Sequence, residues 1–241
     1  MHHLCRKGGC LLLVQVRFNV RIARGDGTFA TRDDDADPVY RSSLVFGLYG
    51  DNAPVSVEQF LSYIDPAQFT VPSFASSLFS AVTPEDGLLV GGKIKGLEST
   101  VFNNQSVLQY GGKILPSKLW LNPSDLSRLP HDRGCLLTHR DLEVEPRFGI
   151  TTKAAKALDS THTVFGEVLE GEEFIRRCEF LPTYSVSTST SEEPGSLAAE
   201  IFTQQKNLFR NVAKSIGDDR IDKLYEGKLL RKVDVSSVEL L

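Results

Sequence analysis

Two stretches near the N-terminus carry residue types that bind metal ions. The first contains His2, His3, Cys5 and Cys10, whose imidazoles and thiolates could ligate zinc, but their spacing fits no established zinc motif. The second is an acidic run over 33–37 that lacks the ligand spacing and the glycine of a defined Ca²⁺ loop. We therefore interpret residues 1–10 as an N-terminal tail and the acidic run as a solvated loop, and we expect neither a metal nor a cofactor.

Composition and charge narrow the classes of function further. The chain has 241 residues, of which 41% are hydrophobic and 24% charged, and this is ordinary for a globular protein with a substantial core. The formal net charge of −4 argues against nucleic acid or an anionic membrane as a partner, because both usually require a basic face. The sequence also lacks a run of about 18 apolar residues, so we expect no membrane span.

The elements that could position a site are mostly short strands. Residues 14–22 alternate between apolar and polar side chains, which predicts a half-buried strand, and 43–50 predicts a second strand antiparallel to it. Many short strands separated by glycine and proline are typical of a barrel or a sandwich. Further strands of this kind are predicted over 77–82, 87–90, 135–138, 148–151, 163–168 and 228–240.

Three helices are predicted among these strands. The first covers 52–64, with Pro54 in its first turn and with Ser56 and Gln59 spaced as a capping box. The second covers 172–179. The third covers 196–215 and follows a loop rich in Ser, Thr and Glu.

Several segments resemble the cyclophilins, a family of peptidyl-prolyl cis-trans isomerases. The most specific segment is T-H-T-V-F-G-E-V-L-E-G over 161–171, which is similar to the family signature HVVFGEVVEG. The stretches 45–60, 78–92, 148–166 and 229–235 also resemble segments of the family. The resemblance implies a mainly β fold, namely a closed antiparallel eight-stranded barrel capped by two helices, with an extra C-terminal helix here. It would form one domain over 11–241, with an insertion at 184–227.

The resemblance also implies a reaction, the rotation of X-Pro peptide bonds in client proteins. Resonance opposes this rotation with a barrier of about 18–20 kcal/mol, so the uncatalysed process takes tens to hundreds of seconds. Catalysis requires an apolar pocket for the proline ring, anchors for the flanking backbone and a donor to the prolyl nitrogen. The partners would be proline-containing segments of other proteins, and we expect a monomer.

The donor position is one of several at which this chain departs from the family. The arginine of the family's F-H-R motif corresponds to Ala81, which has no donor, and Arg147 or Arg140 could replace it. Val90, Gly149 and Ala157 stand where the family has Gln, Phe and Trp, and His139-Arg140 replaces its Ala-Asn pair. The substrate-binding residues that the resemblance implies are Phe79, Leu88, Val90, His139, Phe148, Leu158 and His162.

Two alternatives stay open at this point. Phe79 and Phe148 also suit the protein core, because both alternate within strand patterns. The protein is either a divergent isomerase with weak or altered activity, or a binding and assembly factor of the same fold that has lost catalysis.

The stretch S-I-G-D-D-R over 215–220 resembles the chloroplast cyclophilins of plants and algae and implies a thylakoid-lumen location, although no transit peptide is visible.

Overall fold

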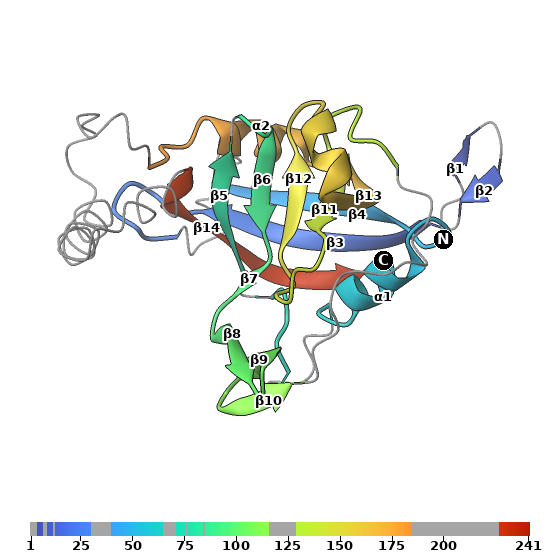
Figure 1. Cartoon of the computed structure of the whole chain (residues 1–241). Coiled ribbons are helices and arrows are strands. Elements are labelled where there is room, and N and C mark those ends of the chain that lie inside the picture. The colour runs from blue at the N-terminus through green and yellow to red at the C-terminus, as the bar shows by residue number, and fades with distance from the viewer. Residues whose placement is uncertain are drawn as a thin grey trace.

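A closed antiparallel barrel forms the body of the protein. The computed structural model describes residues 4–6, 9–11, 13–29, 40–64, 71–75, 77–83, 85–115, 129–184 and 227–241. The main sheet has the order β14-β3-β4-β13-β11-β12-β6-β5-β7, and β14 also pairs with β5, which closes eight strands into a barrel (Figure 1). The predicted fold class is therefore confirmed. The eight barrel strands are β3 (Leu13–Ile22), β4 (Arg41–Tyr49), β5 (Ser77–Thr83), β6 (Leu88–Gly91), β11 (Leu136–Arg140), β12 (Phe148–Thr151), β13 (His162–Glu170) and β14 (Lys228–Leu240).

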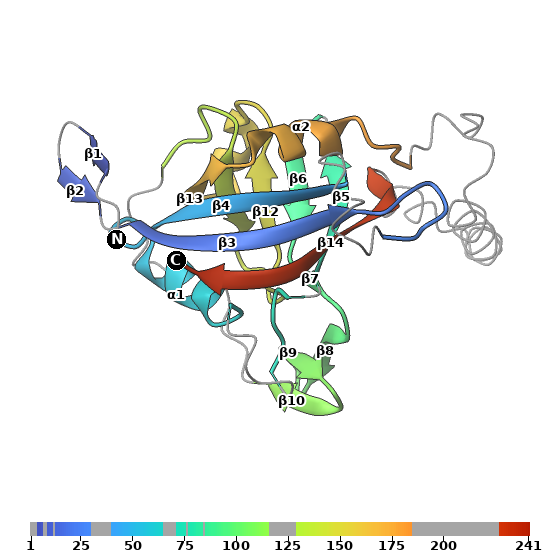
Figure 2. The same cartoon turned by 180° about the vertical axis from the view of Figure 1, so that it is seen from behind.

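Smaller sheets lie outside the barrel, as Figures 1 and 2 show. In the segment predicted as a tail, β1 (Leu4–Arg6) and β2 (Gly9–Leu11) pair as a hairpin. After β7 (Lys93–Ile94), the chain forms a three-stranded meander that the sequence analysis did not predict. Its first turn is tight because Asn103 and Asn104 adopt φ angles of 49° and 61°, which asparagine tolerates well. The meander consists of β8 (Leu97–Phe102), β9 (Gln105–Tyr110) and β10 (Lys113–Leu115).

Two α-helices cover opposite ends of the barrel (Figure 1). The second, α2 (Glu172–Glu179), has the predicted bounds, whereas α1 (Pro54–Leu61) is shorter than the predicted 52–64. The predicted third helix over 196–215 lies outside the described residues. Within the described ranges, every helix is too short or too polar to cross a membrane.

The predicted capping box of α1 is wrong. The N-cap residue is Ala53, and no side chain caps the helix. Ser56 is only 2% exposed, and its Oγ lies 2.8 Å from Nε2 of His139 on β11. The hydroxyl therefore ties the helix to the barrel wall instead of satisfying the helix terminus.

Aromatic side chains fill the interior of the barrel. Phe60 of α1 is fully buried, and its ring centroid lies 4.9 Å from that of Phe74, 5.5 Å from that of Phe148 and 5.3 Å from that of Phe165. The barrel strands contribute further rings to this cluster, including Phe18 of β3, whose ring centroid lies 5.9 Å from that of Phe60. Phe60 therefore plugs one end of the barrel, and α1 is attached through it.

We expect the substitution Phe60→Ala to lower the free energy of unfolding by about 3–5 kcal/mol, because it leaves a large cavity among aromatic rings. Urea unfolding monitored by circular dichroism measures this loss. The matched control is Phe180→Ala, which removes a ring that is 89% exposed and should change stability by less than about 0.5 kcal/mol. Equal losses in the two variants would contradict the plug assignment.

Candidate functional site

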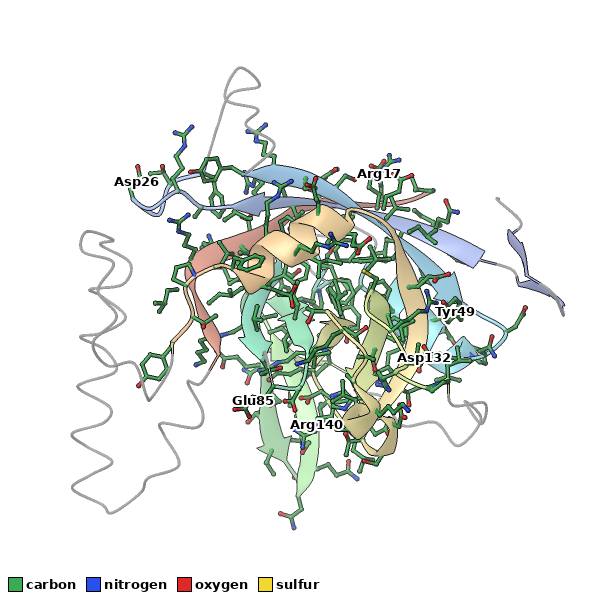
Figure 3. All side chains as sticks on the ribbon, turned by 90° about the horizontal axis from the view of Figure 1, so that it is seen from above. Arg17, Asp26, Tyr49, Glu85, Asp132 and Arg140 are labelled. Carbon is green, nitrogen blue, oxygen red and sulfur yellow. The ribbon has the colours of Figure 1, made fainter. Side chains whose placement is uncertain are left out.

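A pocket of about 440 Å³ opens on the outer surface of the barrel, between the β5–β6 hairpin and the start of β13. Side chains alternate between the two faces of a strand, so the buried Leu89 and Ile150 point into the barrel. Their neighbours Val90 and Gly149 lie on the outer face and line the pocket. In Figure 3, Arg140 and Glu85 lie on the same side of the barrel, and this is the side on which the pocket opens.

The barrel brings most of the predicted site residues together. Six of the nine line this pocket, although they come from distant parts of the sequence. Three others named in the sequence analysis, Arg140, Gly149 and Ala157, line it as well. The six are Leu88, Val90, Arg147, Phe148, Leu158 and His162.

The floor of the pocket is apolar. Leu88, Ala155 and Leu158 form a small buried cluster of their own, separate from the barrel core, and Val90 packs against it. A Cβ atom on Gly149 would lie only 2.5 Å from Cδ1 of Leu88, so the Leu88 side chain occupies the space over this glycine. The floor is therefore aliphatic at the position where the resemblance had implied an aromatic ring.

Charged side chains stand at the rim. Nε and Nη2 of Arg147 each lie 2.6 Å from Oε2 of Glu145, so the guanidinium is held in one orientation. Arg140 is exposed and borders the pocket near His162. The acidic groups Asp86 and Glu143 also line the pocket, and the rim therefore carries both signs of charge.

Three predicted site residues lie elsewhere. Phe79 is 2% exposed and packs in the core between Phe148 and Phe174, at centroid distances of 5.9 and 6.0 Å. His139 is 1% exposed, and its imidazole is hydrogen-bonded to Ser56, so it links β11 to α1. It therefore does not lie on the outer face of the barrel, where the pocket opens. Ala81 lies beside the pocket, paired in register with Val90. Phe148 borders the pocket, but its ring is 1% exposed and belongs to the core cluster.

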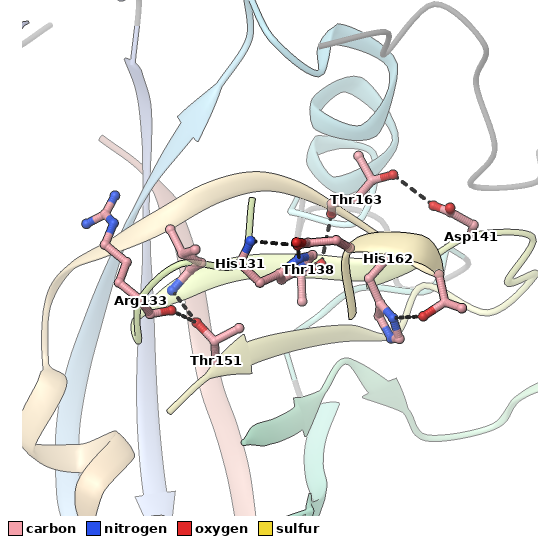
Figure 4. Close-up of polar contacts among 10 residues, drawn as sticks. His131, Arg133, Thr138, Asp141, Thr151, His162 and Thr163 are labelled. Atoms are coloured by element: carbon pink, nitrogen blue, oxygen red, sulfur yellow. Dashed lines mark hydrogen bonds and ion pairs between the residues drawn. The ribbon is translucent and has the colours of Figure 1, made fainter. Parts of the chain in front are cut away.

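A buried histidine that the sequence analysis missed holds one wall of the pocket in place (Figure 4). His131 is fully buried; its Nδ1 lies 2.7 Å from Oδ1 of Asp159, and its Nε2 lies 2.9 Å from Oγ1 of Thr138. The Thr138 hydroxyl in turn donates to the carbonyl oxygen of Thr163, at 3.0 Å. The hydrogen bonds of His131 hold the pKa of Asp159 below its usual range. This chain of bonds fixes the 3-10 helix η2 (Lys156–Ser160), which carries Ala157 and Leu158, against β11 and β13.

His162 is neutral in the folded protein over most of the pH range. Burial, with additional contributions from His131 and Arg140, lowers the pKa of its imidazole to about 4. Its Nδ1 lies 2.9 Å from Oγ1 of Thr161. The pocket therefore presents an uncharged ring at this end. The described residues show no group of three His, Cys, Asp or Glu side chains arranged to hold a metal, and the side chains at positions 2, 3, 5 and 10 lie outside this description.

Comparisons with known proteins agree with this arrangement. The family model described as "Cyclophilin type peptidyl-prolyl cis-trans isomerase/CLD" matches residues 36–205, which is more than half of the chain. The chain is similar to the rhodopsin-specific isozyme of peptidyl-prolyl cis-trans isomerase from Calliphora vicina, with 31% identity over 157 residues. This match covers 63% of the present chain and 58% of the fly protein. On the evidence of the family match and the closed barrel, the chain belongs to the cyclophilin-type peptidyl-prolyl cis-trans isomerase family.

Proposed function

We propose that this protein is a divergent peptidyl-prolyl isomerase that accelerates rotation about X-Pro bonds in other proteins during their folding or assembly. The observation that carries the proposal is the aliphatic floor of the outer pocket, formed by Leu88, Val90 and Leu158. Its volume of about 440 Å³ suits a small apolar group such as a proline ring. The carboxylates and guanidinium groups stay at the rim, where they can contact a peptide backbone.

The pocket can lower the rotational barrier without forming a covalent bond. A planar amide is more polar than a twisted one, because resonance places partial charge on its oxygen and nitrogen. An apolar floor therefore favours the twisted state over the planar one, and such differential stabilisation is what accelerates a reaction. Arg147 stands at the rim with its orientation fixed by Glu145, and we propose that it contacts the bound peptide.

A second function, peptide binding without catalysis, is favoured by one specific observation. Ala81 lies beside the pocket, paired with Val90, and its methyl group cannot donate a hydrogen bond. Removing one transition-state donor typically costs about 10²–10³ in rate. The two functions differ in a measurable way, since a binding module would hold a proline peptide without changing its isomerisation rate.

A thylakoid-lumen location is proposed on the resemblance of S-I-G-D-D-R to the chloroplast members of the family. This stretch, 215–220, lies outside the described residues. Detection of the protein in a lumenal fraction of isolated thylakoids would support the location, and its recovery elsewhere in the cell would contradict it.

We expect the protein to accelerate cis-trans isomerisation of short X-Pro peptides in a protease-coupled assay. The variant Val90→Trp should abolish the acceleration, because the indole would fill the pocket above Leu88 and Leu158. The matched control is Val101→Trp, which introduces the same ring at a site on β8 that is 70% exposed and does not line the pocket. If the wild-type protein binds the peptides but their isomerisation proceeds at the uncatalysed rate, the isomerase function is contradicted and peptide binding without catalysis is supported.

His162 also predicts a pH dependence of stability. Its folded-state pKa of about 4 lies below the ordinary histidine value of about 6.5, so between these pH values the unfolded chain binds more protons. The contribution of His162 to the free energy of unfolding should therefore fall as the pH drops from about 6.5 to about 4. The variant His162→Gln should show a weaker loss than the wild type in urea unfolding at about pH 7 and about pH 4.5. A nuclear magnetic resonance titration with a midpoint near 6.5 would contradict the assignment.

A further inference from the structure

We propose that Lys228 supplies the hydrogen-bond donor that Ala81 lacks, with its ammonium group contacting the X-Pro bond held in the pocket. The proposal rests on the isomerase function proposed above and assigns a catalytic residue to it. From the sequence alone, Lys228 is predicted only as the first residue of the last strand.

A row of paired residues leads from the pocket to Lys228. Gly149 on β12 pairs with Val90 on β6, Val90 pairs with Ala81 on β5, and Ala81 pairs with Lys228 on β14. Residues that pair directly across antiparallel strands project from the same face of a sheet. Because Gly149 and Val90 line the pocket, Ala81 and Lys228 extend the same outer face beyond the pocket edge.

The burial of the residues around them supports an outward orientation of the Ala81 and Lys228 side chains. Phe79 and Val82 are both buried in the core, so the strict alternation of β5 breaks between them. Ala81 is partly exposed and pairs with Val90, which lines the pocket, so Ala81 lies on the outer face. Lys228 is half-buried, as expected of a long side chain that lies along the outer surface of the sheet.

The geometry of the β14–β5 pair brings Lys228 close to Ala81. The amide of Val82 donates to the carbonyl oxygen of Gly227 at 2.8 Å, which makes Ala81 and Lys228 a pair without hydrogen bonds to each other. In such a pair the Cα atoms are only about 4.5 Å apart. The ammonium on its four-carbon stem can therefore extend over the small Ala81 side chain toward Val90, whereas a larger residue at position 81 would block it.

Neighbouring positive charges act on the Lys228 ammonium group. Burial lowers the pKa of Lys228, and the positive charges of Lys93 and Arg147 lower it further. Arg147 is itself a pocket residue. Lys228 thus lies near enough to this rim residue to sense its charge, and partial desolvation strengthens the hydrogen bond that its ammonium can donate.

The two other cations are less suited to the same role. Arg147 directly precedes β12, and two strands, β6 and β5, separate β12 from β14 along the row. Arg140 stands at the His162 end of the pocket, on β11, and three strands separate β11 from β14 along the row: β12, β6 and β5. Lys228 alone among these three is paired in register with the position of the missing arginine.

The proposed step moves no atoms between molecules. As the X-Pro bond twists, the nitrogen lone pair leaves conjugation and becomes a hydrogen-bond acceptor. An N–H of the Lys228 ammonium donates to it in the twisted state only, so the interaction lowers the barrier without tightening ground-state binding. When the bond becomes planar again, this hydrogen bond is lost and the product can leave.

The test compares kcat/KM in the protease-coupled assay with the dissociation constant of the same peptide. We expect Lys228→Met and Lys228→Gln to lower kcat/KM about 10²-fold while the dissociation constant stays unchanged. Lys228→Arg should retain most of the activity. The matched control is Lys93→Met, which removes a nearby exposed cation and should leave the rate unchanged. A double variant, Ala81→Arg with Lys228→Met, should recover activity, because it returns a donor to the same row.

Three other outcomes of this experiment would overturn the proposed role of Lys228. Wild-type activity that survives Lys228→Met and Lys228→Gln, or that is lost only in Arg147→Met, overturns the role of Lys228 and leaves the isomerase function intact. A parallel rise in the dissociation constant assigns Lys228 to ground-state binding and overturns the donor role. Absence of acceleration by the wild-type chain overturns the proposed function and the Lys228 assignment together.

Discussion

The pairing of β14 with β5 is the constraint on which the rest of the structure depends. It joins the last strand to the middle of the chain and turns an open sheet into a closed barrel. Closure leaves a narrow interior, which is filled by aromatic rings such as Phe18, Phe60 and Phe148. Because these rings pack the interior of the described barrel, the pocket lies on its outer face.

The same closure explains how a site can be assembled from dissimilar parts. The pocket is lined by residues of β5, β6, β11, β12 and β13, the 3-10 helix η2 and connecting loops. The hydrogen bonds of His131 to Asp159 and Thr138 keep this helix in position. The side chain of Leu88 occupies the space over Gly149, where the resemblance had implied an aromatic ring. The barrel thus preserves a pocket even where individual residues differ from the family pattern.

The fold was largely predictable because its signal is periodic and local. Alternating apolar residues located most barrel strands, and the segment 161–171 identified the family. The bounds of α2 also followed from its apolar spacing. The cap of α1 was misjudged because Ser56 has the right spacing for a capping box but a competing partner, His139, that is 83 residues away. The meander β8–β10 was missed because its strands are mostly exposed and lack a buried face.

The site was predictable only in part, for a different reason. The resemblance indicated which positions lie near the pocket, and the barrel places Leu88, Leu158 and His162 there. It could not show that His139 points toward α1, because a strand residue can serve either face. Nor could it reveal the spatial neighbours of His131 and Lys228, since these come from strand pairings and loop contacts that no local pattern encodes.

The seam of the barrel also has a consequence for how the protein can change in length. The amide of Gly227 donates to the carbonyl oxygen of Tyr184, and the amide of Tyr184 donates to the carbonyl oxygen of Lys228. The two ends of the intervening segment are therefore held side by side at the barrel. A side chain on Gly227 would collide with the carbonyl oxygen of Val82, which fixes this junction sterically. The closure entropy of a loop grows slowly, by about 0.6 kcal/mol for each doubling of its length. Residues could therefore be gained or lost between Tyr184 and Gly227 with little cost in stability to the barrel.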